Sequence, residues 1–176
     1  MESIHLRTTR LAVISATPEM ARAERDDRAL LTRAYHIRLA EPWPPPLNDE
    51  ASLAWTISVL DALGDQAGWG GWYICLPGRD GEPAIAIGGC GFKGLPDASG
   101  TVEVGYSVVE EYQRRGYASE AIGALIDWAF AQPGVRRVIA ETFPELIGSL
   151  GVLRKLGFRQ VEGGSEPGVL RFERLR

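Results

Sequence analysis

The chain has 176 residues, enough for one domain with its own hydrophobic core and too few for two domains of ordinary size. Hydrophobic residues make up 45% and charged residues 24%, the balance of a globular rather than a disordered protein. Nineteen basic against 23 acidic side chains give a formal charge of −4, which argues against a nucleic-acid-binding protein, because such proteins concentrate positive charge on one face.

The sequence carries no pattern of a membrane or secreted protein. Its first 15 residues alternate apolar and polar positions, so they lack the continuous apolar stretch of a signal peptide. No window approaches the ~18 consecutive apolar residues of a membrane-spanning helix. Cys75 and Cys90 lie in apolar segments without metal-binding or redox spacing, so we interpret both as core thiols and expect no metal site. These observations predict a cytoplasmic protein with no membrane partner.

The N-terminal half alternates between extended and helical patterns. In chain order, the expected elements are a strand at 5–15, a helix or helix pair at 19–34, a helix at 50–63, and strands at 72–76 and 84–92. The segment EPWPPPLND, residues 41–49, excludes a regular helix or central strand, because proline can continue neither. Asn48 or Asp49 is expected to cap the helix that follows this segment.

The C-terminal half has a β-α-β-α-β order. The expected elements are a strand at 101–109, a helix at 118–131, a strand at 137–142, a helix at 145–156, and strands at 158–161 and 169–175. The helix at 118–131 has the clearest apolar stripe. Hairpin-connected strands followed by this order predict an α+β fold with a single mixed, mostly antiparallel central sheet flanked by helices.

The strand TVEVGYSVV, residues 101–109, carries the first candidate catalytic residue. Alternation places its larger apolar residues on a core face and Glu103 on the opposite face, beside the small residues Gly105 and Ser107. A carboxylate beside two small residues leaves room for a ligand above the sheet. The alternative is a solvated face with an incidental Glu.

The next segment, YQRRGYA, precedes the clearest helix. The first four amides of a helix have no partner within it and lie at the positive end of its dipole, where anions bind. Gly116 lets the backbone approach a ligand closely, and Arg114 and Arg115 add positive charge. The segment is neither a Walker A loop nor the three-glycine dinucleotide fingerprint. It is either a phosphate-binding loop or an ordinary helix start with solvated arginines.

The segment FPELIGSLGVLRKLGF places a hydroxyl on an apolar helix face. Ser149 either takes part in chemistry or bonds a carbonyl one turn earlier. Gly148 and Gly151 each weaken the helix by roughly 1 kcal/mol relative to Ala, which predicts that something packs closely against it.

Together these segments resemble the core of the GNAT superfamily of acetyl-CoA-dependent N-acetyltransferases, in its RimJ/RimL-like (ribosomal-protein-acetyltransferase-like) branch. The family's pyrophosphate loop, Gln/Arg-x-x-Gly-x-Gly/Ala, is matched by Gln113, Gly116 and Ala118. The resemblance is strong over the C-terminal half and weak over the early RTTRLAV. It implies a GNAT-type fold in a single N-acetyltransferase domain over residues 1–176.

The resemblance implies acetyl-CoA as the cofactor and CoA as the product. The loop amides would wrap the pyrophosphate, and the pantetheine arm would pair with the strand ending at Val109. The cofactor-binding residues implied are Ser107, Val108, Val109, Gln113, Arg114, Arg115, Gly116, Tyr117, Ala118 and Ser119.

For catalysis, we expect Glu103 to act as a base through water, with Glu141 as the second candidate. Deprotonation at pH 7 costs a lysine-like amine about 4.6 kcal/mol and an α-amine about 1.1 kcal/mol, so a base matters more for the first. The backbone N–H of Val108 or Val109 is the expected donor to the thioester oxygen. Ser149 is the candidate acid for the departing thiolate.

Two positions depart from the family pattern. The family usually has Asn where this chain has Leu146, and members that use a Tyr as the acid place it near Leu153. Both are apolar here, so the acid role passes to Ser149, to water or to no group. Leu146 also motivates the alternative that the protein is a non-catalytic acyl-CoA-binding module. A phosphate-ligand-binding protein of another kind is a third reading.

The acceptor is expected to be the primary amine of a peptide N-terminus, an amino acid or a small metabolite. The resemblance places the N-terminal helices and segment 41–49 on the acceptor side. Trp43 and Trp55 are candidates for an apolar wall, or core residues. Three acidic residues face either a cationic amine or solvent, namely Asp49, Glu50 and Asp97. The resemblance implies a monomer or a homodimer.

Overall fold

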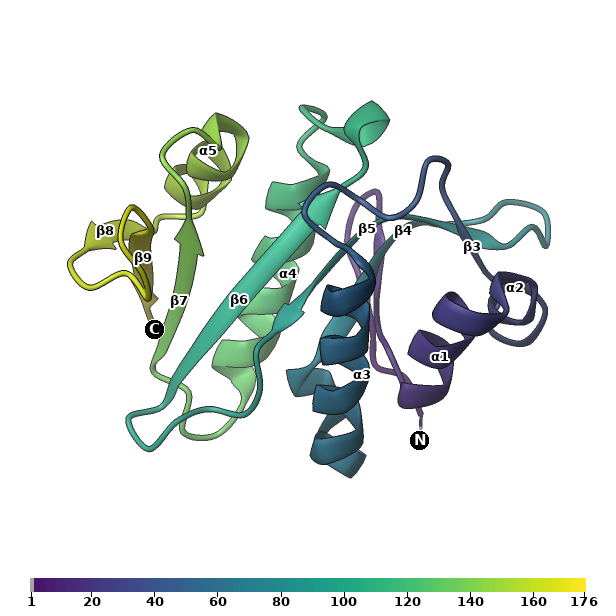
Figure 1. Ribbon diagram of the computed structural model, residues 1–176, viewed down its shortest axis with the longest axis horizontal. Helices are drawn as coiled ribbons and strands as arrows, with labels where there is room; N and C mark the ends of the chain where they lie inside the picture. The colour runs from purple at the N-terminus through teal and green to yellow at the C-terminus, as the bar shows by residue number, and fades with distance from the viewer. Residues whose placement is uncertain (1) are drawn as a thin grey trace.

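The computed structural model describes residues 2–176 as one mixed β-sheet with helices on both faces (Figure 1). Counted over those residues, its nine strands are β1 (His5–Arg7), β2 (Ala12–Ser15), β3 (Ile37–Leu39), β4 (Gly71–Leu76), β5 (Ala84–Phe92), β6 (Thr101–Val108), β7 (Arg137–Thr142), β8 (Arg159–Val161) and β9 (Leu170–Leu175). The strand order is β1-β2-β4-β5-β6-β7-β9-β8, with β3 beside β5. The β3–β5 and β6–β7 pairs are parallel and the others antiparallel, which confirms the predicted α+β fold with a mixed, mostly antiparallel sheet.

The helices divide between the two faces of the sheet. They are α1 (Pro18–Asp26), α2 (Arg28–Tyr35), α3 (Glu50–Leu63), α4 (Tyr117–Ala131) and α5 (Ile147–Lys155), with short 3₁₀ segments at Gly64–Trp69 and Glu110–Tyr112. Helices α1 to α3 share one hydrophobic cluster with the sheet, and α4 and α5 share the other. On α4, Ile122, Leu125 and Ile126 are completely buried, and each contributes about 1.5–3 kcal/mol of burial free energy. This burial holds α4, and therefore its N-terminus, fixed on the sheet.

Local side chains explain where the first helices begin. Thr17 accepts a hydrogen bond from the Met20 amide, Asp27 from Leu30 and Asp49 from Ser52, so each of α1 to α3 has an N-cap. The predicted helix at 50–63 is confirmed with Asp49 as its cap. The segment at 19–34 is a helix pair, because the chain leaves helical geometry at Asp27.

The N-terminal strand prediction is corrected by the structure. The expected strand at 5–15 is a hairpin, since the Thr8 amide donates to the Leu11 carbonyl at 3.0 Å and turns the chain. Strand β3 was missed, because three residues are too few for a recognisable alternation.

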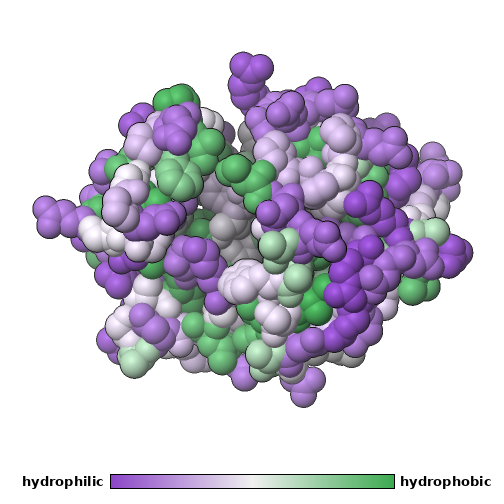
Figure 2. Space-filling model, viewed as in Figure 1, coloured by the Kyte–Doolittle hydropathy of each residue, from purple (hydrophilic) through white to green (hydrophobic). Residues whose placement is uncertain are grey.

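Strands β6 and β7 separate after a short paired stretch. They pair from Thr101 with Arg137 to Glu103 with Ile139. Beyond that point β6 continues along β5 while β7 continues along β9, so the two strands diverge. The space-filling view shows the surface hollowed between the part that carries α5 and the part that carries β6 (Figure 2). We call this opening the β6–β7 splay. Within residues 2–176, no helix has the length and apolarity to cross a bilayer.

Candidate active site

The N-terminus of α4 is the first candidate element of the site. Gly116 has φ +81°, in the left-handed region that favours glycine, and Arg114 has φ +58°. Among the described residues, the backbone amides from Arg114 to Ser119 have no hydrogen-bond acceptor. Free amides at the positive end of a helix, with two adjacent arginines, fit the negatively charged pyrophosphate that the sequence resemblance implies.

Arg10 braces this loop, a contact that the sequence analysis did not predict. Its guanidinium donates to the Arg115 carbonyl at 2.9 Å and to the Glu120 carboxylate at 2.7 Å, and it lies 4.6 Å from the Tyr117 ring centre. Thr8 and the Arg10 amide also donate to Glu120, at 2.6 and 2.8 Å. Although burial raises the pKa of Glu120, these hydrogen bonds and the Arg10 charge outweigh it, and the pKa falls below its usual value. The β1–β2 turn is thereby tied to the loop before α4.

Beyond Glu103, the edge of β6 facing the splay carries backbone groups with no strand partner among residues 2–176. The Lys93 amide donates to the Glu103 carbonyl and the Val109 amide to the Ile87 carbonyl, so alternate residues of β6 from Glu103 onward turn their backbone groups toward β5. Val108 lies between two such residues, and its N–H therefore points toward the splay. Of the two predicted oxyanion donors, Val109 is already bonded to Ile87, which leaves Val108.

The remaining predicted cofactor residues gather at the same end of β6. Gln113 donates from its side-chain amide to the Val108 carbonyl at 2.8 Å and so ties the loop to the strand. Ser119 is buried in the first turn of α4. Ser107 faces the other side of the sheet, where its hydroxyl donates to the Pro46 carbonyl at 2.5 Å.

Ser149 on α5 meets Tyr106 of β6 beside the splay. Their hydroxyls lie 3.1 Å apart, and the Tyr106 hydroxyl is 3.3 Å from the Ser149 carbonyl. No bond from Ser149 to a carbonyl one turn earlier occurs within residues 2–176. Burial raises the pKa of Tyr106, against the opposing effect of the Ser149 hydrogen bond, so the phenol keeps its proton at neutral pH. Thr142, at the end of β7, is buried, and its hydroxyl has no partner in the described chain.

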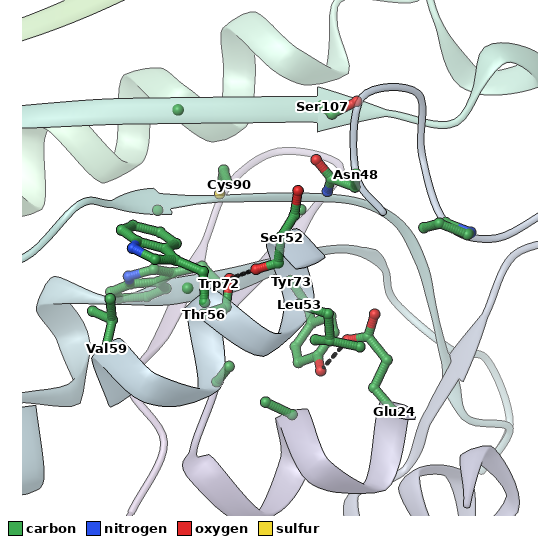
Figure 3. A pocket seen from close by; sticks show the side chains of 18 of the residues that line it. Glu24, Asn48, Ser52, Leu53, Thr56, Val59, Trp72, Tyr73, Cys90 and Ser107 are labelled. Atoms are coloured by element: carbon green, nitrogen blue, oxygen red, sulfur yellow. Dashed lines mark hydrogen bonds between the residues drawn. The ribbon is translucent and has the colours of Figure 1, made fainter. Parts of the chain in front are cut away.

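A pocket of about 710 Å³ lies on the opposite face of the sheet, beneath α1, α3 and segment 41–49 (Figure 3). Its floor consists of two rows of residues paired across β4, β5 and β6. The first row is Gly71, Gly91 and Gly105, and the second is Tyr73, Gly89 and Ser107. Because four of the six are glycines, much of the floor is bare backbone.

Comparisons with known proteins identify the family of this chain. A family model described as "Acetyltransferase (GNAT) domain" matches residues 13–159. The chain belongs to this family. The predicted family is thus confirmed, whereas the extent of the domain over all 176 residues stays a prediction.

Relatives of this GNAT protein include the uncharacterized N-acetyltransferase YjdG of Bacillus subtilis (strain 168), 40% identical over 72 residues, which are 41% of this chain and 43% of YjdG. The chain matches less than half the length of its curated relatives. One similar structure is an acetyltransferase from Agrobacterium tumefaciens str. C58, with a TM-score of 0.66 and 24% identity, covering 100% of this chain and 96% of that one. Another is RimL, a ribosomal L7/L12 alpha-N-protein acetyltransferase in complex with coenzyme A, with a TM-score of 0.67 and 19% identity, covering 99% of this chain and 98% of that one. At this identity they show the shared fold.

In this GNAT protein, α5 begins later than the sequence indicated. It starts at Ile147 rather than Glu145, because Leu146 occupies the N-cap position and has no polar side chain to cap the helix. The close packing expected at Gly148 and Gly151 is not made by the protein: within residues 2–176, a Cβ at either position would meet nothing within 4 Å. These glycines therefore leave open space along the helix instead of accommodating a neighbour.

The two candidate bases have different surroundings. Glu103 forms an ion pair with Lys93. It lies two residues before Gly105 on β6, and therefore on the same, pocket-facing side of the strand. Glu141 accepts hydrogen bonds from Arg171 at 2.8 Å and from the Ser165 amide at 3.0 Å. Burial raises the pKa of Glu141, but these partners lower it further, so the net shift is downward. Its engaged oxygens make Glu141 the weaker candidate.

The expected acceptor-side residues mostly line the pocket. Trp43, Trp55, Asp49 and Glu50 do so, and Asp49 also caps α3. Asp97 lies outside the pocket, in the β5–β6 turn, where it accepts hydrogen bonds from Ser99 and Thr101. The buried Cys75 and Cys90 lie in the core, and burial raises the pKa of Cys75 to about 12.

Removing the Arg10 brace tests the role of the loop in cofactor binding. We expect Arg10→Ala to weaken acetyl-CoA binding about tenfold, because the loop loses its bond at the Arg115 carbonyl. Isothermal calorimetry with acetyl-CoA measures the change. Arg7→Ala, at an exposed arginine of the same hairpin, is the matched control and should bind as the wild type does. Equal affinities for the two variants would remove Arg10 from the cofactor site.

Proposed function

We propose that this GNAT protein transfers the acetyl group of acetyl-CoA to a primary amine, which attacks the thioester directly. The observation that carries the proposal is the convergence of three features at the C-terminal end of β6. They are the unpartnered amides before α4, the backbone edge at the splay, and the pocket on the other face of the sheet. Bound acetyl-CoA supplies the activated acyl group.

The loop and the strand edge would hold the cofactor. The amides from Arg114 to Ser119 bind the pyrophosphate, with Gly116 allowing the close approach. The pantetheine arm lies along the splay edge of β6, and the Val108 N–H donates to the thioester oxygen, polarising the carbonyl.

Two side chains would transfer protons, one as the base and one as the acid. Glu103, which is ion-paired with Lys93, takes a proton from the incoming amine through water. On the other side of the sheet, Ser149 donates a proton to the departing thiolate, and Tyr106 fixes the Ser149 hydroxyl. The acceptor is an amine of a peptide N-terminus, an amino acid or a small metabolite, and it enters through the pocket.

A thermal-shift titration followed by a thiol-release assay tests the proposal. A ligand at a hundred times its Kd stabilises by about 2.7 kcal/mol, which corresponds to several degrees at this chain length. We expect acetyl-CoA and CoA, but not ATP, to raise the Tm, and a panel of primary amines to release CoA. Stabilisation without release for any amine would favour the non-catalytic acyl-CoA-binding alternative. No shift with either CoA species would end the proposal.

Glu103→Gln should lower kcat by about tenfold or more for a lysine-like acceptor, with the greatest loss at low pH. At high pH the amine is already neutral and needs no base. The measurement is the pH dependence of kcat, with Glu162→Gln at an exposed remote site as the control. An unchanged pH profile rules Glu103 out as the base.

A further inference from the structure

The wall of the pocket opposite β6 carries a buried carboxylate. Glu24 of α1 is 9% exposed, and one of its oxygens accepts from the Trp43 indole at 2.8 Å. The other accepts from the Tyr73 hydroxyl at 2.7 Å. The close-up shows Glu24 rising from α1 toward Tyr73, while Ser107 lies at the far side of the pocket (Figure 3).

The negative charge of Glu24 has no counter-ion in the described chain. Both of its partners are neutral donors, and none of the ion pairs within residues 2–176 includes it. Of the two arginines that line the pocket, Arg25 pairs with Asp26 and Arg28 is exposed at the rim. Burial and the Glu24 charge raise the pKa of Tyr73 well above its usual range, so Tyr73 remains a neutral donor. A carboxylate this deeply buried ordinarily has a cation beside it.

The sheet sets the distance across the pocket from Tyr73, which bonds Glu24, to Ser107 on β6. Tyr73, Gly89 and Ser107 are direct neighbours across β4, β5 and β6. Adjacent strands lie about 4.8 Å apart, so Tyr73 and Ser107 are roughly 10 Å apart. No side chain rises from Gly89 between them. Trp55 lines the same cavity, is exposed, and offers aromatic surface to a cation.

We propose that the pocket binds a small acceptor with two cationic groups, an α,ω-diamine or a longer polyamine. Glu24 holds the ammonium at one end, and the amine at the other end lies near Ser107 for acetylation. A small acceptor is favoured over a peptide because the cavity of about 710 Å³ has the size of a small-molecule site. Segment 41–49 also covers its β6 side through the bond between Pro46 and Ser107. This inference rests on the proposed function and names its substrate class.

The experiment compares α,ω-diaminoheptane with heptylamine, which has the same chain and one ammonium. Binding is measured by calorimetry with the protein saturated with CoA, and acetylation by thiol release from acetyl-CoA. We expect the diamine to bind about tenfold or more tightly than the monoamine, and its kcat/KM for acetylation to be higher by the same factor.

Glu24→Gln should abolish this preference, and Glu19→Gln, at an exposed acid of the same helix, should keep it. The Tm of each variant is measured alongside, and the wild-type comparison decides the question even if Glu24→Gln does not fold. Equal binding of the two amines to the wild type, or a preference that survives Glu24→Gln, would overturn the inference. So would tighter binding of a lysine-containing peptide than of the diamine.

The calorimetry also separates this inference from the proposed function. If the diamine binds preferentially through Glu24 but no amine releases CoA, the cation site stands and acetyl transfer fails. If amines release CoA with no preference for the diamine, acetyl transfer stands and the cation site fails.

Discussion

Replacing Gly116 with valine is expected to reduce acetyl-CoA affinity by at least a hundredfold, roughly 2.7 kcal/mol. A left-handed φ of +81° is costly for any residue with a Cβ and most costly for a β-branched one. The new Cβ would lie 3.3 Å from the Arg10 guanidinium, so it also disturbs the brace of the loop. The valine methyl groups would further obstruct the approach to the free amides. Calorimetry with acetyl-CoA gives the affinity directly.

Gly134→Val separates loss of the ligand site from backbone strain. Gly134 has φ +83° in the turn after α4, and a Cβ there meets no atom of the described chain within 4 Å. This variant carries similar strain at a distance from the loop, so its stability should fall while its affinity for acetyl-CoA persists. Wild-type affinity in Gly116→Val would remove the claim that this loop binds the pyrophosphate.

Ser149→Ala is expected to lower kcat about a hundredfold with little change in KM for acetyl-CoA, because general acids contribute on this order or more. The Tyr106 hydroxyl remains but loses its partner at 3.1 Å. Tyr106→Phe should give a smaller loss, since Ser149 stays in place but is less well oriented. Steady-state kinetics for both variants provide the measurement.

The double variant shows whether the two hydroxyls act as a unit. If they do, the loss in the double variant equals that of Ser149→Ala rather than the product of the two losses. Ser58→Ala removes an exposed helix serine that donates to the Trp55 carbonyl, and it should retain full activity. An unchanged kcat in Ser149→Ala would pass the acid role to water or to no group.

The sequence predicted the elements whose pattern is long and regular. Helix α4 was recognised because its buried stripe persists over four turns, and α3 because Asp49 precedes an amphipathic run. The glycine loop and the strand before it were found for a similar reason, since both lie within one continuous segment. Short elements and ends were less certain: β3 has three residues, and α5 starts at Ile147 without a capping side chain.

The parts of the site that the sequence missed depend on distant partners. Arg10 is 105 residues from the Arg115 carbonyl that it binds, and Glu24 is 49 residues from Tyr73. No periodicity or motif relates such positions before the sheet is assembled. The choice between Val108 and Val109 likewise depends on the register of β6 with β5, which one strand alone does not set.

The bare floor of the pocket has a consequence for how this protein could diverge. Gly105 has open space where a Cβ would be added, so alanine there adds a methyl group to the cavity without displacing any atom of residues 2–176. A Cβ at Gly89 would make ordinary contacts at 3.7 Å or more. Side chains at these two positions would shorten or narrow the path between Glu24 and Ser107 at little cost to folding. Acceptor preference could therefore drift through single substitutions, while the loop before α4 and the hydrophobic core stay unchanged.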